Sequence, residues 1–180
     1  LNLILGVAGQ FSLGHAGFIA IGSYSGAILG KMINGLPGLF AGMAVGVVIS
    51  VIVAFLVGLP TLRLKGDYLA IATLGVAEII RVAVTNMKIT NGAAGISGIP
   101  LTNTWTITYI FLVVTTILIL NYTFSSAGRA TYGVLQDEIA AESMGVQVTK
   151  YKILAFVLGA ATASIGGTLS ATTLGAVTPS

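Results

Sequence analysis

The sequence predicts an all-α polytopic membrane protein: a bundle of transmembrane helices with a broken or re-entrant segment and one short cytoplasmic helix. Hydrophobic residues make up 56% of the 180 positions and charged residues only 7%, whereas a soluble domain carries about 25% charged residues. The charged residues also leave long uncharged stretches, each exceeding the roughly 20 residues that a bilayer-spanning helix needs. These stretches are 1–30, 32–62, 89–128 and 153–180.

The beginning of the chain predicts a helix end followed by an interruption. Residues 1–9 have the composition of a helix that starts upstream, and the next span is a short one at Ala16–Leu29. Between them, GQFSLGHAGF places Gln10, Ser12 and His15 in an apolar run, and irregular backbone survives at membrane depth only where protein or water satisfies it. His15 is either packed at a helix end or part of a proton relay. A metal site is not expected, because the chain has no second His and no Cys.

The second span is predicted at Leu36–Leu59, because Pro37 and Pro60 bracket it and proline is tolerated near helix ends. Small residues recur here and elsewhere at four-residue spacing, which lets membrane helices approach closely. The ladders predict a compact bundle, and they consist of Gly22, Gly26 and Gly30; Gly38, Gly42 and Gly46; and Gly159, Ala163 and Gly167.

The third span, Asp67–Asn86, is unusual because it contains ionisable residues. Glu78, Arg81, Thr85 and Lys88 fall on one stripe of a helix, and charges at membrane depth normally face a bundle interior or a wet cavity. The stripe is therefore either a local ion pair that holds two helices together or the polar lining of a permeation path.

After this span, NGAAGISGIP predicts a glycine-rich loop in which Asn91, Gly92 and Gly95 could border a pathway, as discontinuous segments do in transporters. The fourth span is Trp105–Phe124, flanked by aromatic residues of the kind that anchor helices at the membrane interface. The last span is Ile153–Leu174.

Between the last two spans lies an acidic segment. Three of the five acidic residues are Asp137, Glu138 and Glu142. Asp137 can cap a short helix with Glu138 in its first turn, and Gly145 offers a left-handed stop. Leu135 and Ile139 were expected to share the acidic face, with Ala140, Ala141 and Met144 opposite. Such a helix either docks on a basic partner or lies solvated in the cytoplasm, and the residues alone leave both open.

The basic residues predict the orientation. Five of them, Arg63, Lys65, Arg129, Lys150 and Lys152, fall on one side of the predicted spans, and Lys31 and Lys88 on the other. The positive-inside rule then places 129–152 in the cytoplasm and explains the net charge of +3 without a nucleic-acid partner. The chain shows neither a Walker A sequence nor a nucleophile elbow, so no catalytic residues are predicted.

Four stretches together closely resemble the permease subunits of branched-chain amino acid ABC importers, of the LivM type more than the LivH type. They are GQFSLGHAGFIAIGSYSGAIL, TLRLKGDYLAIATLGVAEIIR, NGAAGISGIP and DEIAAESMGVQVTKYKILAFVLGAATASIGGTLSA. The resemblance implies a multi-pass subunit of a bacterial or archaeal inner membrane, of which 1–180 would be a single permease domain truncated at both ends. It also implies a second permease subunit, two cytoplasmic ATPases that bind ATP and Mg²⁺, and a periplasmic substrate-binding protein.

The resemblance further implies that the loop at about 129–152 carries a coupling helix that sits in a cleft of the ATPase. Leu135 and Gln136 depart from the family pattern, which commonly has an arginine and an acid there. The residues that match the coupling motif are Asp137, Glu138, Ala140, Ala141, Glu142 and Gly145.

Three other functions are compatible with the sequence. A urea or short-amide importer shares much of this permease pattern. An ion-coupled secondary transporter would use Glu78, Arg81 and His15 as its charge site. A structural membrane scaffold would need none of these residues for transport.

Overall fold

The computed structural model describes residues 3–9, 12, 14–33, 35–62, 64, 67–100 and 105–178. Long helices form most of this part of the chain, which confirms the all-α prediction: α1 (His15–Met32), α2 (Leu36–Thr61), α3 (Asp67–Asn86), α4 (Trp105–Phe124) and α7 (Val148–Leu174). The shorter elements are η1 (Leu3–Val7), η2 (Lys88–Thr90), η3 (Gly92–Ala94), α5 (Ser126–Gln136), α6 (Glu138–Ser143), and the strands β1 (Ile96–Ser97) and β2 (Ala176–Val177). The helix end predicted at residues 1–9 is a π-helical turn in η1.

Four helices in the described ranges are long and apolar enough to cross a membrane: α2, α4, α7 and the Tyr68–Asn86 part of α3. A fifth span was predicted at Ala16–Leu29, and α1 does form there, but it is not one of the four. Its hydropathy is lowered by His15 and Lys31 at its ends and by serines and glycines between them. It packs against α2, α3 and α7, and its buried residues lie at the centre of the bundle.

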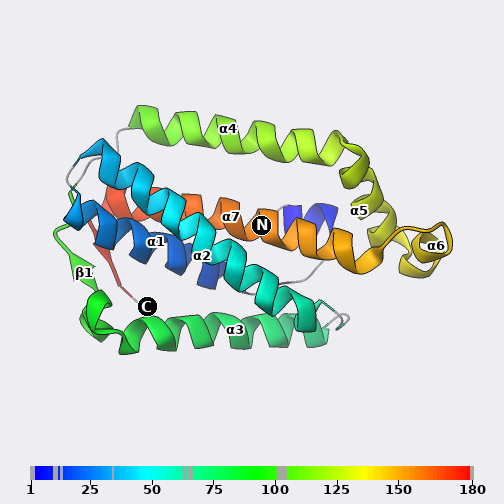
Figure 1. Cartoon of the computed structure of the whole chain (residues 1–180), viewed down its shortest axis with the longest axis horizontal. Coiled ribbons are helices and arrows are strands. Elements are labelled where there is room, and N and C mark those ends of the chain that lie inside the picture. The colour runs from blue at the N-terminus through cyan, green and yellow to red at the C-terminus, as the bar shows by residue number, and fades with distance from the viewer. Residues whose placement is uncertain are drawn as a thin grey trace.

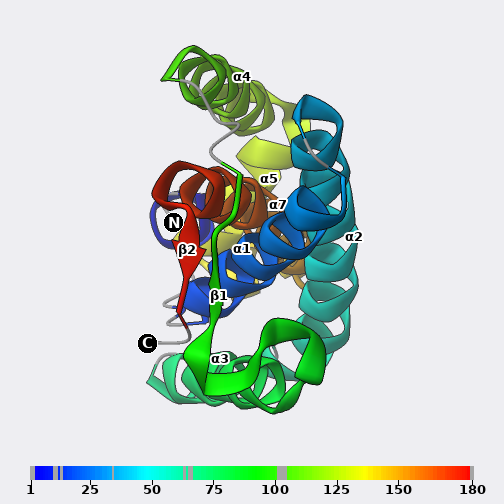
Figure 2. The ribbon, with the colours of Figure 1, turned by 90° about the vertical axis from the view of Figure 1, so that its left-hand side faces the viewer.

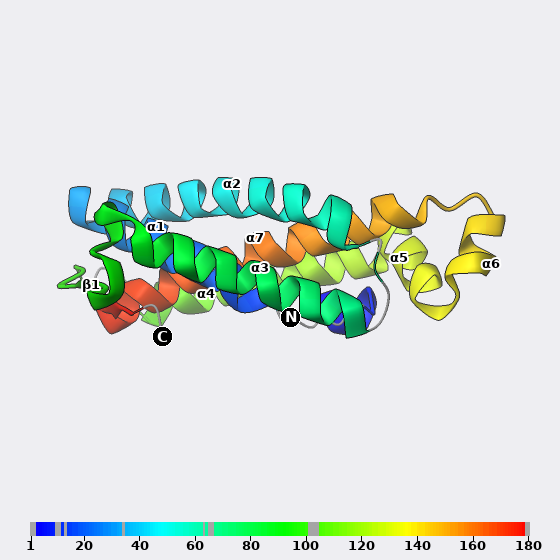
Figure 3. The same ribbon diagram turned by 90° about the horizontal axis from the view of Figure 1, so that it is seen from below.

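The long helices run between two ends of the bundle (Figure 1). At one end, which we call the α6 end, α2 and α4 end, α3 and α7 begin, and α5 and α6 lie. The opposite end, which we call the β end, holds Met32 of α1, η2, η3, β1 and β2. Seen from below, α5 and α6 extend beyond the bundle at the α6 end (Figure 3).

Glycines set the contact between α1 and α7 at the centre of the bundle. A Cβ atom added at Gly22 would lie 2.0 Å from the carbonyl oxygen of Ser164, and one added at Gly167 would lie 2.1 Å from that of Ile19. Gly42 of α2 reaches α1 as closely, since its added Cβ would lie 2.8 Å from the Cα of Gly26. The predicted ladders of small residues mark contacts between long helices at Gly22, Gly26, Gly42, Gly46 and Gly167. Gly30, Gly38 and Gly159 instead lie nearest to Ile99, Ile33 and Ile4.

Two hydrogen bonds cross the same interface in opposite directions. The Ser23 hydroxyl of α1 donates to the carbonyl of Gly167 at 3.0 Å, and the Thr168 hydroxyl of α7 donates to the carbonyl of Gly22 at 2.9 Å. Both are buried, where water does not compete for the donors. They are possible because neither glycine carries a side chain that would separate the two backbones.

The remaining helices cover this centre to different degrees. Figure 2 shows α2 and α3 beside α1, with α4 on the side of α7 away from α3. One end of α4 meets α2, where Phe111 lies against Phe40. Along Trp105–Phe124, which the structure describes throughout, no residue is buried. An apolar helix that buries so little of its own surface is suited to contact with lipid or with another chain.

One prediction about a helix end and one about the stripe on α3 were wrong, although the predicted bounds of α3 itself are confirmed. The helix α2 was expected to end before Pro60, but it continues to Thr61. Proline lacks an N–H and therefore costs one hydrogen bond in the last turn, and neighbouring donors close that turn: the Thr61 hydroxyl binds the carbonyl of Val57 at 2.7 Å, and the Leu62 N–H binds that of Gly58 at 3.0 Å. Lys88 was expected on the stripe of α3, but α3 ends at Asn86.

A short antiparallel pair, β1 with β2, closes the β end. Ile96 lies opposite Val177, and the N–H of Ile99 donates to the carbonyl of Gly175 at 3.1 Å. These contacts fasten the glycine-rich loop to the end of α7, so the loop packs on the bundle through its own backbone.

Candidate functional site

The acidic segment at the α6 end is built from two helices rather than one. The first, α5, starts at the N-cap Ser125, whose hydroxyl accepts a hydrogen bond from the N–H of Gly128 at 3.1 Å. It ends at Gln136, because Asp137 takes an extended conformation with φ −155° and ψ 110°. Asp137 therefore turns the chain between α5 and α6.

Asp137 also begins α6. Its carboxylate oxygen Oδ1 accepts hydrogen bonds from the N–H groups of Ile139 at 2.9 Å and Ala140 at 3.1 Å. The negative charge of Asp137 and of Glu138 in the first turn suits the positive end of the helix dipole. The predicted cap is confirmed by these two bonds.

The end of α6 is closed by backbone hydrogen bonds around Gly145. The N–H of Val146 donates to the carbonyl of Ala141 at 3.0 Å, and that of Gly145 to Glu142 at 2.9 Å. This is the Schellman pattern, which requires a left-handed residue after the helix, and Gly145 has φ +81°. A helix of six residues is thus defined at both ends by its own sequence.

An ion pair connects α6 to α7. Glu138 Oε1 contacts Lys152 Nζ, and the lysine side chain is only 11% exposed while the glutamate is 31% exposed. The sequence analysis used Lys152 only to predict the orientation of the chain in the membrane. It did not predict the pairing of Lys152 with Glu138. The pair holds the first turn of α6 against the first turns of α7.

The outer surface of α6 combines apolar and acidic side chains. Ile139 is 75% exposed and Met144 85% exposed, and Glu142 and Ala140 are exposed beside them while Ala141 is buried. Leu135 was expected on the face of Ile139, but this was wrong because the chain turns at Asp137. Leu135 instead packs on the N-terminal segment, where its Cδ1 lies 2.0 Å from a Cβ atom added at Gly9.

Removing the cap is expected to loosen α6 selectively. In Asp137→Ala the two N–H groups lose their acceptor, which costs about 1 kcal/mol of helix stability. Hydrogen exchange of the Ile139 and Ala140 amides should accelerate by roughly fivefold, while exchange in the middle of α7 should not change. The control Asp137→Asn keeps an acceptor oxygen and should retain most of the protection; equal loss in both variants would contradict the role of the cap.

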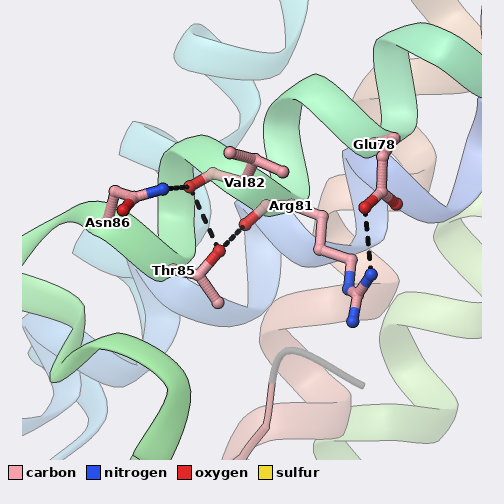
Figure 4. Close-up of polar contacts among 5 residues, drawn as sticks. All are labelled: Glu78, Arg81, Val82, Thr85 and Asn86. Carbon is pink, nitrogen blue, oxygen red and sulfur yellow. Dashed lines mark hydrogen bonds and ion pairs between the residues drawn. The ribbon is translucent and has the colours of Figure 1, made fainter.

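A second polar site lies on α3. The Nη1 of Arg81 contacts Oε1 of Glu78 at 3.0 Å, with the arginine side chain 56% and the glutamate 58% exposed. Figure 4 shows both side chains on the same side of the helix, with Thr85 one turn further along. The Thr85 hydroxyl donates back to the carbonyls of Arg81 at 2.6 Å and Val82 at 3.1 Å. The predicted stripe thus forms from Glu78 to Thr85.

The pair borders a groove of about 440 Å³ between α1, α3 and the residues Val177 and Thr178. The rest of its lining is mostly apolar, with Ile19 and Leu74 among the residues. Tyr24 of α1 also lines the groove; it is only 4% exposed. Its hydroxyl has no hydrogen-bond partner in the part of the chain that the structure describes. Sequence reasoning missed Tyr24, because nothing in its spacing distinguishes it from an ordinary packed aromatic residue.

The other residues predicted for a pathway lie elsewhere. Gln10 is outside the described residues. Ser12 and His15 are near the start of α1, where the hydroxyl of Ser12 and Nδ1 of His15 are buried without a partner among the described residues. Neither borders the groove.

Asn91, Gly92 and Gly95 belong to the β end. The Asn91 amide donates to the carbonyl of Gly95 at 3.1 Å, and a Cβ added at Gly95 would lie 2.2 Å from the carbonyl oxygen of Val177. The structure therefore gives these residues packing contacts, and a role in transport stays a prediction. Across the described ranges no group of His, Asp and Glu side chains could hold a metal ion.

The whole chain, residues 1–180, matches a family model described as "Branched-chain amino acid transport system / permease component". It is 35% identical, over 214 aligned residues, to the high-affinity branched-chain amino acid transport system permease protein LivM of Salmonella typhimurium. It is 34% identical, over the same length, to LivM of Escherichia coli K12. Both alignments cover 99% of this chain and 50% of the relative, so the chain spans about half the length of these curated proteins. No solved structure matches significantly.

Proposed function

The chain belongs to the family of branched-chain amino acid transport system permease components, and from this membership we propose that it forms part of the transmembrane pathway of an ATP-driven importer. The transported molecules are branched-chain or other small hydrophobic amino acids, which a periplasmic binding protein delivers. The names of the two LivM relatives support this substrate class. In this proposal the chain forms part of the pathway and changes conformation during transport. Other subunits hydrolyse ATP.

The observation that carries this proposal is the surface of α6. A helix that is capped at both ends and projects beyond the bundle (Figure 3) exposes Ile139, Met144 and Glu142 together. Exposed aliphatic side chains beside acids fit a cleft that offers apolar contact and basic residues. We therefore assign α6 as the coupling helix that docks on a cytoplasmic ATPase, with Asp137 and Gly145 shaping it.

The proposed orientation follows from this docking. Arg129, Lys150 and Lys152 lie at the α6 end, and Lys31 lies at the β end. By the positive-inside rule the α6 end faces the cytoplasm of a bacterium or archaeon. The β end then faces the periplasm and the binding protein.

The proposed assembly contains a second permease subunit and two ATPase subunits besides this chain. ATP and Mg²⁺ bind to the ATPases, which alternate the access of the pathway because nucleotide and substrate prefer different conformations. The proposal gives this chain no catalytic residue.

The other candidate functions predict different results. A urea or short-amide importer would have the same assembly but a binding protein that ignores leucine. An ion-coupled transporter would work without an ATPase, and a scaffold would transport nothing. The family match and the LivM relatives favour the branched-chain importer.

Reconstitution tests the proposal directly. The full-length permease, its partner permease and the two ATPases are placed in proteoliposomes with the binding protein. We expect leucine-loaded binding protein to stimulate ATP hydrolysis and to drive leucine uptake that stops without ATP. Uptake that persists without ATPase subunits and collapses with the ion gradient would overturn the proposal.

A further inference from the structure

The charge pair of α3 lies at mid-depth of its helix. Glu78 is one residue from the centre of the apolar span Tyr68–Asn86, and Arg81 lies on the next turn. Charges at this depth are costly in lipid and normally border a polar pathway. Transporters bind their substrates near the same depth.

The pair is accessible to a ligand. Both side chains are more than half exposed, and both border the groove between α1 and α3. An ion pair whose purpose was to join α3 to α1 would instead be enclosed between the two helices. A guanidinium has five N–H donors, and a carboxylate has acceptor sites for several hydrogen bonds, so each group can hold the other and a ligand together.

The groove adds a third polar group and an apolar wall. Tyr24 lines the groove, and its hydroxyl is buried and has no partner among the described residues. A buried hydroxyl without a partner is unfavourable, and a polar ligand in the groove would supply one. Ile19, Leu74 and Val84 provide the apolar remainder.

We infer that this groove is a binding site for a zwitterionic aliphatic amino acid. The carboxylate of the ligand accepts hydrogen bonds from Arg81, its ammonium donates to Glu78, and Tyr24 pairs with one of these two groups. The aliphatic side chain lies against Ile19, Leu74 and Val84. A zwitterion suits the pair because it brings one charge of each sign and leaves the site with the same net charge.

This inference rests on the proposed function, and its test uses the same assembled transporter in nanodiscs without the binding protein. Equilibrium binding of radiolabelled leucine is measured for wild type, Arg81→Gln, Glu78→Gln and Tyr24→Phe. A charge-assisted hydrogen bond contributes about 1.5–3 kcal/mol, so each of the two charge variants should bind at least about tenfold more weakly. Tyr24→Phe, which removes only a hydroxyl, should bind roughly threefold to tenfold more weakly.

Two competitors identify the chemistry. Leucinamide lacks the carboxylate and 4-methylpentanoate lacks the ammonium, so both should displace leucine at least about tenfold less well than unlabelled leucine. The control Lys31→Gln removes an exposed charge at the β end and should bind like wild type. Co-purification of all subunits shows that each variant assembles.

The outcomes separate this inference from the proposed function. If wild type binds no leucine, if Arg81→Gln and Glu78→Gln bind like wild type, or if both analogues compete equally well, the site is refuted even where ATP-driven uptake persists. If Arg81→Gln loses the second permease and keeps leucine binding, the groove is a subunit interface and the inference is also wrong. Absence of ATP-driven uptake in wild type refutes the proposed function instead.

Discussion

Replacing Gly22 by alanine is expected to destabilise the bundle by about 3 kcal/mol, the upper end of the usual cost of overpacking. The added Cβ would lie 2.0 Å from the backbone carbonyl oxygen of Ser164, and a backbone atom cannot move aside as a side chain can. Separating α1 from α7 would also stretch the hydrogen bonds of Ser23 to Gly167 and of Thr168 to Gly22. Thermal denaturation in detergent, followed by size-exclusion chromatography, measures the loss.

The matched control is Gly166→Ala on α7. Gly166 is exposed, and a Cβ added there meets nothing within 4 Å. Alanine is favoured over glycine in helices by roughly 1 kcal/mol, so this variant should be as stable as wild type or more so. Equal melting temperatures for Gly22→Ala and Gly166→Ala would show that the close approach of α1 and α7 does not cause a loss of stability in Gly22→Ala.

Reversing one charge on α6, the proposed coupling helix, is expected to reduce the stimulation of ATP hydrolysis by loaded binding protein at least about tenfold; the variant is Glu142→Lys. Glu142 is exposed on α6 and forms no ion pair with the described residues. The fold should therefore be unaffected, and the change acts on docking alone. Like charges placed across an interface cost several kcal/mol, which is more than this effect requires.

The control is the conservative change Glu142→Asp, which keeps the charge on α6 and should leave both stimulation and subunit assembly intact. Co-purification of the ATPase should weaken in Glu142→Lys and respond to salt, because exposed charges are screened. Full stimulation of ATP hydrolysis in the Glu142→Lys assembly would show that α6 is not the coupling helix.

The sequence was sufficient to predict features that depend on local composition. The bounds of α4 match the prediction of Trp105–Phe124, because aromatic residues mark both ends of the apolar span. The capping of α6 was also predictable, since Asp137 and Gly145 have few alternative uses at these positions. The contacts of the glycine ladders followed from the same reasoning, although the partner of each ladder did not.

Features that depend on distant residues were not predictable. The pairing of Ile96 with Val177 joins segments far apart in the sequence, and a two-residue strand has no pattern of its own. The break at Asp137 separated Leu135 from Ile139, because one aspartate both ends α5 and begins α6. Tyr24 became a candidate only when the groove and its unpartnered hydroxyl were visible.

The interface of α1 with α7 has a mechanical consequence. Glycine, alanine and serine let the two backbones approach closely, and the edge-to-face contact of Phe18 with Phe156 interlocks the helices further. The two opposed hydrogen bonds, Ser23 to Gly167 and Thr168 to Gly22, then act as a latch that fixes the register. Because α7 is one helix of 27 residues, about 40 Å long, and Lys152 near its beginning is paired with α6, a displacement of α6 would act on this latch through a single continuous helix.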